Sequence, residues 1–231
     1  MSKRPTPAVR SPEIKTKVED AGLVERRRAQ LTASAITCFS ANGYHATTIR
    51  DIAEHAKVSV GLIYQYVEDK EDLLFLALEE VLTSYRRQIP LALADVTDPL
   101  DRFCAAVRVY CRVNDASIEA TVLAYRETKS LRRDRRDLIK QWELETNKLI
   151  AACIRACVKA GVFEDIDVEL FTHQLIMFSH GWALKAWRFG TRMTVDEYVD
   201  RGLRLMLNSV LTEQARERIP PAKPKARASA A

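Results

Sequence analysis

Apolar residues recur every three to four positions along most of this chain, which is the spacing that buries one face of an α-helix. No segment shows the strict alternation of a half-buried strand. The pattern therefore predicts an all-α fold of about nine helices. The expected helices span about residues 25–42, 48–56, 60–67, 69–87, 117–129, 133–160, 167–189 and 194–211, with a further helix that begins at 98.

Local signals mark several ends of these helices. Gly43 follows the first helix, at the place where a left-handed residue commonly closes the last turn. Pro90 is expected to lie beyond the end of the fourth helix, because proline lacks a backbone donor. Thr194 and Glu197 have the spacing of a capping box, which predicts the start of the last helix.

Residues 48–67 are predicted to form two short helices joined by a tight turn. The Thr48 hydroxyl is placed to accept from the Asp51 amide while the Asp51 carboxylate reaches back, which makes a second capping box. Ser59 is placed to cap the following helix. Only residues 56–58 separate the two helices, and so short a turn holds them at the steep angle of a helix-turn-helix. This segment indicates a DNA-binding protein.

The second of these helices offers contacts to base edges although it contains no Lys or Arg. Val60 or Leu62 would contact thymine methyl groups, and Gln65 would pair with adenine. An arginine contact to guanine would have to come from Arg50 on the preceding helix. Glycine allows a close approach of the backbone, and tyrosine and lysine suit phosphate oxygens. The candidate DNA-contacting residues are Thr48, Arg50, Ser59, Val60, Gly61, Tyr64, Gln65, Tyr66 and Lys70.

These residues resemble the tetracycline-repressor (TetR) family of one-component transcriptional regulators. The resemblance covers residues 25–85 and rests on Thr48, Asp51-Ile52-Ala53, Val58-Ser59, Gly61, Ile63-Tyr64, Tyr66, Lys70-Glu71 and Leu73-Leu74. It implies a dimer that binds a palindromic operator, and a small molecule among the fifth to eighth helices that tilts the fourth helix and releases the DNA. Lys57 stands where the family usually has glycine, which predicts a strained left-handed residue. Val67 stands where the family favours phenylalanine.

Charge and composition divide the chain into four regions. Residues 1–24 carry five positive and three negative side chains, and residues 216–231 carry five and one. Both segments have little apolar surface and are predicted to be disordered tails. The N-terminal tail either lies along phosphates or in a minor groove, or is simply solvated. Between the tails we expect a helix-turn-helix domain at 25–70 and an effector-binding and dimerisation domain at 71–215.

The last two helices are too apolar to pack on one face alone. The eighth carries Leu170, Met177 and Trp182 on more than one stripe, and the ninth adds Leu205 and Met206. A helix that is apolar on two sides needs two partners. We expect the second partner to be the same helix pair of another subunit, which gives a homodimer through a four-helix bundle. A two-fold axis suits a palindromic operator with half-sites about 34 to 36 Å, or a multiple of one DNA turn, apart.

The second domain is expected to bind a small hydrophobic effector and no cofactor. From Tyr125 onward, an arginine-rich turn, a long helix and the sequence GWALKAWRFG resemble regulators of fatty-acid, sterol or aromatic-acid breakdown that respond to acyl-coenzyme A. An apolar slot would take the acyl group and arginines would hold the phosphates. The candidate arginines are Arg132, Arg133, Arg135, Arg136 and Arg188. The candidate pocket residues are Tyr125, Trp142, Phe178, His180, Trp182 and Arg188, each with a core role as its alternative.

Other classes of function explain less of the sequence. The chain has no G-x-S-x-G, H-E-x-x-H, P-loop or dinucleotide fingerprint, so an enzyme is not expected. A regulator of efflux genes that senses hydrophobic drugs is one alternative. An effector-independent architectural DNA-binding protein is the other alternative. This alternative gives no function to the large region 71–215.

The remaining polar residues predict less. The five cysteines are scattered and are expected to be buried thiols, with a metal site or redox switch at Cys153 and Cys157 as the alternative. His173 and His180 share a helix face, where a metal site, a pH-sensitive interface or a ligand contact competes with a core role. No apolar run reaches the roughly 18 residues of a membrane span, and no signal peptide is evident. We therefore expect no membrane association and a cytoplasmic location.

Overall fold

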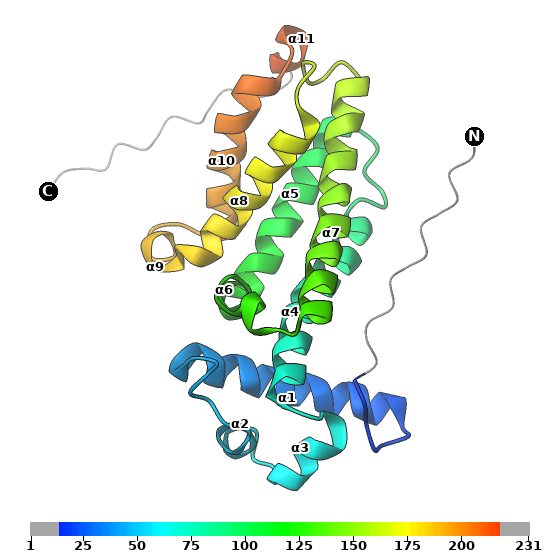
Figure 1. Ribbon diagram of the computed structural model, residues 1–231. Coiled ribbons are helices and arrows are strands. Elements are labelled where there is room, and N and C mark those ends of the chain that lie inside the picture. The colour runs from blue at the N-terminus through cyan, green and yellow to red at the C-terminus, as the bar shows by residue number, and fades with distance from the viewer. Residues whose placement is uncertain (1–13, 218–231) are drawn as a thin grey trace, which may run out of the picture.

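The computed structural model describes residues 14–217, which form helices with short connections (Figure 1). This range contains eleven α-helices and one 3-10 helix, so the predicted all-α class is confirmed. Residues 1–13 and 218–231, and with them most of the predicted tails, lie outside the described residues. The elements are α1 (Ala21–Asn42), α2 (Ile49–Ala56), α3 (Val60–Tyr66), α4 (Lys70–Ala92), α5 (Pro99–Ala116), α6 (Ile118–Glu127), η1 (Thr128–Ser130), α7 (Arg133–Lys159), α8 (Val168–Leu184), α9 (Ala186–Phe189), α10 (Val195–Val210) and α11 (Glu213–Arg216).

The smaller end of the molecule holds α1, α2, α3 and the first turns of α4 (Figure 1). The predicted caps are present. The Asp51 carboxylate accepts from the Thr48 amide at 2.7 Å while the Thr48 hydroxyl accepts from the Asp51 amide at 3.2 Å. The Ser59 hydroxyl accepts from the Leu62 amide at 3.2 Å. Because α2 and α3 are only two turns long, these caps decide where each helix begins.

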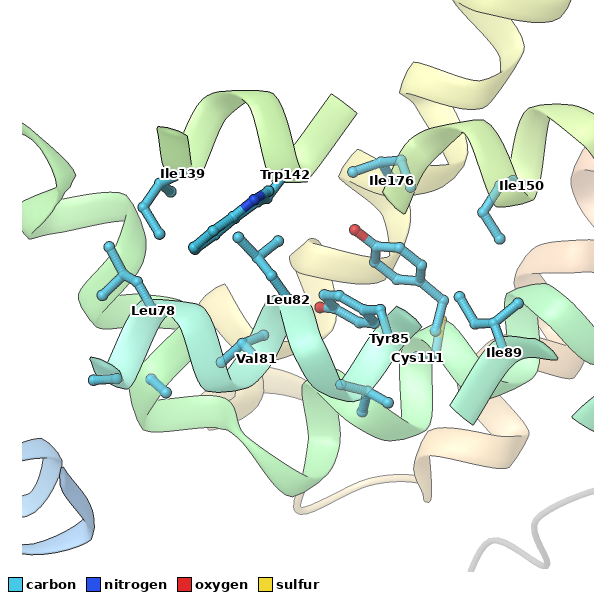
Figure 2. Packing of buried hydrophobic residues seen from close by; sticks show 14 of the residues in the cluster. Leu78, Val81, Leu82, Tyr85, Ile89, Cys111, Ile139, Trp142, Ile150 and Ile176 are labelled. Atoms are coloured by element: carbon cyan, nitrogen blue, oxygen red, sulfur yellow. The ribbon is translucent and has the colours of Figure 1, made fainter. Parts of the chain in front are cut away.

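The larger end is a bundle in which α4, α7, α8 and α10 pack around α5, with α6 against α4 and α8 (Figure 1). Figure 2 shows apolar side chains of α4 directed toward Ile139 and Trp142 of α7. Deeper in the core, the Tyr85 ring of α4 stacks on Tyr110 of α5 with ring centroids 4.0 Å apart. The helix α4 therefore belongs to both ends of the molecule.

Several helix ends differ from the sequence prediction. The first helix begins at Ala21 rather than at Glu25, because the Asp20 side chain accepts from the Leu23 amide and opens the helix one turn earlier. The predicted eighth helix is divided into α8 and α9 at Lys185, which leaves the helical conformation (φ −124°, ψ 26°). The short helices α9 and α11 raise the count from the nine expected to eleven in the described range.

The fourth helix continues through Pro90 to Ala92, although proline was predicted to lie beyond its end. Proline removes only one main-chain hydrogen bond here, and only two helical residues follow it. Ile89 and Leu93 on either side are buried, and the Leu93 amide donates to the Ile89 carbonyl at 3.2 Å. Burial of the last turn outweighs the lost hydrogen bond.

The turn between α2 and α3 has the predicted strain. Lys57 lies in the left-handed region (φ 57°, ψ 45°) and is the one non-glycine residue with positive φ in the described range. The Lys57 amide donates to the Glu54 carbonyl at 3.1 Å, and the Val58 amide donates to the Ala53 carbonyl at 3.0 Å. A left-handed residue commonly closes a helix in this way.

The surroundings of the cysteines and of the other candidate metal ligands favour a structural role for these side chains. All five cysteines are free, and burial raises the pKa of Cys111 and Cys157 to about 12, which makes both poor nucleophiles. Within residues 14–217, no group of three or more His, Cys, Asp or Glu side chains is placed to hold a metal ion. Over the same residues, no helix has the length and apolar character needed to cross a membrane.

The strain at Lys57 predicts that Lys57→Gly stabilises the protein by up to about 1 kcal/mol, because glycine adopts positive φ without penalty. Lys57→Ala is the matched control: it removes the lysine side chain but keeps the β-carbon that causes the strain. Urea unfolding of the three proteins measures the difference. A gain in both variants, or a loss in Lys57→Gly, would contradict strain as the cause.

Candidate DNA interface and effector cavity

The outer face of α3 carries the predicted base-contacting residues. Ser59, Gly61 and Gln65 are exposed, Val60 is half-buried, and Ile63 points into the core with no exposed surface. Thr48, Arg50 and Tyr64 are exposed nearby, at α2 and on α3. The fold therefore holds seven of the nine candidate residues at the surface of one helix-turn-helix.

Gly61 leaves space on this face. A β-carbon built at Gly61 would meet only the Ser59 hydroxyl, at 4.0 Å. The chain itself therefore does not require glycine at this position, whose φ is not positive. The open space would allow another molecule to approach the helix backbone closely.

Tyr66 and Lys70 do not have the surface roles that the sequence suggested. Tyr66 is buried, with 3% of its surface exposed. The Lys70 ammonium donates to the carbonyls of Tyr44 at 2.7 Å, Thr47 at 2.8 Å and His45 at 3.3 Å. Lys70 is thus occupied within the chain, where it fixes the loop between α1 and α2. Sequence reasoning missed this because the three carbonyls lie more than twenty positions away.

A cavity of about 300 Å³ lies in the larger end of the molecule, between α4, α6 and α7, with α5 and α8 behind. Its wall is mainly apolar, and three tyrosines contribute polar groups to it together with threonine, lysine, glutamate and histidine side chains. The lining residues are Leu78, Val81, Leu82, Tyr85, Tyr110, Thr121, Ala124, Tyr125, Thr128, Ile139, Lys140, Glu143 and His180.

Two of the six predicted pocket residues, Tyr125 and His180, line this cavity and contact each other. The Tyr125 hydroxyl lies 2.7 Å from His180 Nδ1, and the Tyr110 hydroxyl lies 3.3 Å from His180 Nε2. Burial lowers the pKa of His180 to about 4, so the ring is neutral near pH 7. A neutral ring has one donor and one acceptor, and the two tyrosines satisfy both.

The other four predicted pocket residues lie elsewhere. Trp142 packs on Phe75 with ring centroids 5.7 Å apart, and Phe178 stacks on Tyr198 at 4.5 Å. Trp182 is buried, and its indole donates to a carboxylate of α5 at 2.8 Å. Arg188 is exposed on α9. Helical spacing indicates that a residue is buried, but not which neighbouring helix covers it, so the core alternative holds for the three aromatic residues.

The remaining wall residues were not predicted. Tyr85 and Tyr110 are almost fully buried, and the Tyr85 hydroxyl donates to Asn114 at 2.6 Å. Glu143 also lines the cavity, and burial raises the pKa of its carboxyl group. The one sequence signal for a polar residue of a cavity wall is its place at a core-facing position of an otherwise apolar helix face. That signal also occurs in ordinary cores.

A buried ion pair joins a cavity helix to the start of α4. Arg135 of α7 pairs with Asp72, whose side chain is fully buried, and Arg135 Nη1 lies 3.6 Å from a Glu71 oxygen. The Asp72 carboxylate also accepts from the Glu68 amide at 2.6 Å. Arg132 adds a hydrogen bond of 2.9 Å from its amide to Glu71. These contacts leave Arg135 unavailable for the phosphate contact that the sequence suggested.

Two family profiles match the chain. "Bacterial regulatory proteins, tetR family" matches residues 31–77, and "Tetracyclin repressor-like, C-terminal domain" matches residues 96–210. The regulator HbdR of Aromatoleum sp. (strain CIB) is 48% identical over 203 residues, which cover 88% of this chain and 89% of HbdR. The chain belongs to the TetR family of transcriptional regulators. It is therefore a DNA-binding regulator and not an enzyme.

Other members of the TetR family are similar over most of their length. The repressor KstR2 of Rhodococcus jostii (strain RHA1) is 30% identical over 191 residues, which cover 80% of this chain and 91% of that protein. The structure of the ketosteroid transcriptional regulator KstR2 of Mycobacterium tuberculosis has a TM-score of 0.71 at 20% identity. It covers 86% of this chain and 99% of that one. This last likeness concerns the fold.

The ion pair predicts a large loss of stability on removal of one partner. Arg135→Ala should lower the free energy of unfolding by about 3 to 5 kcal/mol, because it leaves the Asp72 carboxylate buried without its cation. Arg133→Ala, two positions away, removes an arginine whose side chain is 89% exposed and should change stability by less than about 1 kcal/mol. Urea unfolding measures both. Equal effects of the two substitutions would contradict the assigned role of Arg135.

Proposed function

We propose that this TetR-family regulator is a dimeric repressor that leaves a palindromic operator when a small effector enters the cavity of about 300 Å³. The observation that carries this proposal is the position of α4. Its middle turns line the cavity through Leu78, Leu82 and Tyr85, and its first turn follows α3 after three residues. A ligand in the cavity would therefore contact α4, the helix that directly follows α3.

The exposed apolar residues of α8 and α10 support a homodimer. Leu170 and Met177 lie two turns apart on one face of α8, with 54% and 41% of their surface exposed. Leu205 on α10 is 75% exposed. An α8–α10 pair from a second subunit would cover these side chains and form a four-helix bundle. The two-fold axis would then place two copies of α3 for the two half-sites.

We propose an acyl-coenzyme A thioester as the effector. A cavity of about 300 Å³ is at the small end of ligand pockets, and its apolar wall suits a small ring or a short acyl chain. The nucleotide part would remain outside, so cations at the mouth must hold its phosphates. Lys140 lines the cavity and Arg136 lies one turn before it on α7. Arg136 is one of the arginines that the sequence suggested, and Lys140 takes the place of Arg135 as a candidate phosphate contact.

A cationic hydrophobic drug is the second candidate effector. Glu143 gives the cavity one carboxyl group, and a buried carboxylate would pair with a ligand cation. Such a ligand would use Glu143 and would gain nothing from Lys140. The two candidates are therefore distinguished by opposite charges on the ligand.

The proposed base contacts predict separate effects on sequence preference and on overall affinity. Gln65→Ala should relax the preference for adenine at one position of each half-site, at a cost of about 1 to 3 kcal/mol for the preferred base. Gln141→Ala, an exposed glutamine of α7, is the control and should leave the preference unchanged. Selection of bound DNA from a random pool measures both. A wild-type base profile for Gln65→Ala would remove Gln65 from the base contacts.

The proposed effector predicts that thioesters release the operator and free acids do not. Benzoyl- and octanoyl-coenzyme A, their free acids, coenzyme A alone and tetraphenylphosphonium are titrated into the protein on labelled operator. Lys140→Gln should weaken the effective thioester about tenfold, while Lys159→Gln, exposed at the far end of α7, should not. Equal potency of acid and thioester would reject the thioester. Release by tetraphenylphosphonium alone would favour the drug.

A further inference from the structure

The segment before α1, residues 14–20, lies against the C-terminal end of α3, and we call it the N-terminal arm. It precedes the family match, which begins at residue 31. Ile14 is buried and belongs to the hydrophobic core, and Val18 packs against that core. The sequence assigned these residues to a disordered tail. The structure instead packs the arm beside the helix that carries the proposed base contacts.

The arm supplies hydrogen bonds to the last carbonyls of α3. The Lys17 amide donates to the Gln65 carbonyl at 2.9 Å, and the Thr16 hydroxyl donates to the same oxygen at 3.0 Å. A helix leaves its final carbonyls without partners inside the helix, and a seven-residue helix has few bonds of its own. The arm therefore fixes the end of α3 that carries Gln65.

Arg28 of α1 joins the arm to α3. Its guanidinium donates to the Tyr66 carbonyl at 3.0 Å and to the Ile14 carbonyl at 2.6 Å. One side chain thus ties both the start of the arm and the last residue of α3 to α1. A lysine in place of Arg28 would have a single ammonium group and would lack the planar guanidinium that reaches both carbonyls.

Two lysines of the arm lie beside the proposed base contacts. Lys15 pairs with Glu68 at 3.2 Å and compensates a negative charge just beyond α3. Lys17 has an exposed side chain, and its own amide is bonded to Gln65. If Gln65 contacts a base, a lysine whose backbone is bonded to Gln65 would lie within reach of the phosphates that border the groove. The helix α3 has no Lys or Arg of its own, so such a contact must come from a neighbouring segment.

We infer that the N-terminal arm is part of the DNA interface: Thr16 positions α3 through the Gln65 carbonyl, and Lys17 contacts a phosphate beside the half-site. This inference rests on the proposed role of α3 in base contact. It makes two separate claims, one about sequence preference and one about charge.

Four variants of the full chain test the arm on the selected operator. Lys17→Gln should reduce the slope of log K against log salt by about one for each subunit, and should weaken selected and random DNA by the same factor. Lys159→Gln removes the same charge far from α3 and should keep the wild-type slope. Thr16→Val removes the hydroxyl and should broaden the base preference at the Gln65 position without a change of slope. Thr16→Ser keeps the hydroxyl and should preserve the wild-type preference.

The outcomes are distinguishable from failure of the proposed function. If the wild-type chain selects no sequence, the base-contact role of α3 itself is wrong. If it selects an operator and Lys17→Gln has the same salt slope as Lys159→Gln, the phosphate contact is wrong. A wild-type base profile for Thr16→Val, with thermal unfolding unchanged, would overturn the positioning role.

Discussion

The fully buried carboxylate of Asp72, at the start of α4, needs a cation, and Arg135 of α7 supplies it. An unpaired charge at this depth would strongly destabilise the fold. The same carboxylate accepts from the amides of Glu68 and Asp69, so it also sets where α4 begins. Because α3 ends only a few residues earlier, the position of α3 depends on α7, a helix of the other end of the molecule.

The helices that the ion pair joins are also walls of the cavity. A ligand between α4 and α7 can shift the balance between two arrangements only by its difference in affinity for them, typically about 1 to 3 kcal/mol. A second bridge, from His45 to Glu127 at 3.7 Å, joins the loop before α2 to α6. His45 is exposed, and exposed ion pairs contribute little. The pair of Arg135 and Asp72 is therefore the stronger mechanical link between the two ends.

Local chemistry made part of this structure predictable. Caps at Thr48 and Ser59 and the left-handed Lys57 depend on residues a few positions apart, and the structure has all three. Contacts between distant segments were not predictable in the same way. The Lys70 ammonium is surrounded by carbonyls of the α1–α2 loop, and Trp142 faces α4 rather than the cavity. A helical stripe specifies burial, whereas the partner of each buried side chain is set by how the helices cross.

On the proposed function, the lack of Lys and Arg in α3 separates affinity from sequence preference. Most of the affinity of a protein for DNA comes from cations that neutralise phosphates, and α3 offers none. Its base contacts are therefore useful only if neighbouring segments hold it at a fixed height and angle in the groove. The N-terminal arm supports the C-terminal end of α3, and α4 supports it through the ion pair with α7. Because both supports act on the C-terminal end of α3, an effector that moves α4 would shift that end of α3 against the arm. On the proposed function, such a shift would displace the base contacts of α3 from the groove, and the effector would favour the displaced arrangement only by its difference in affinity for the two.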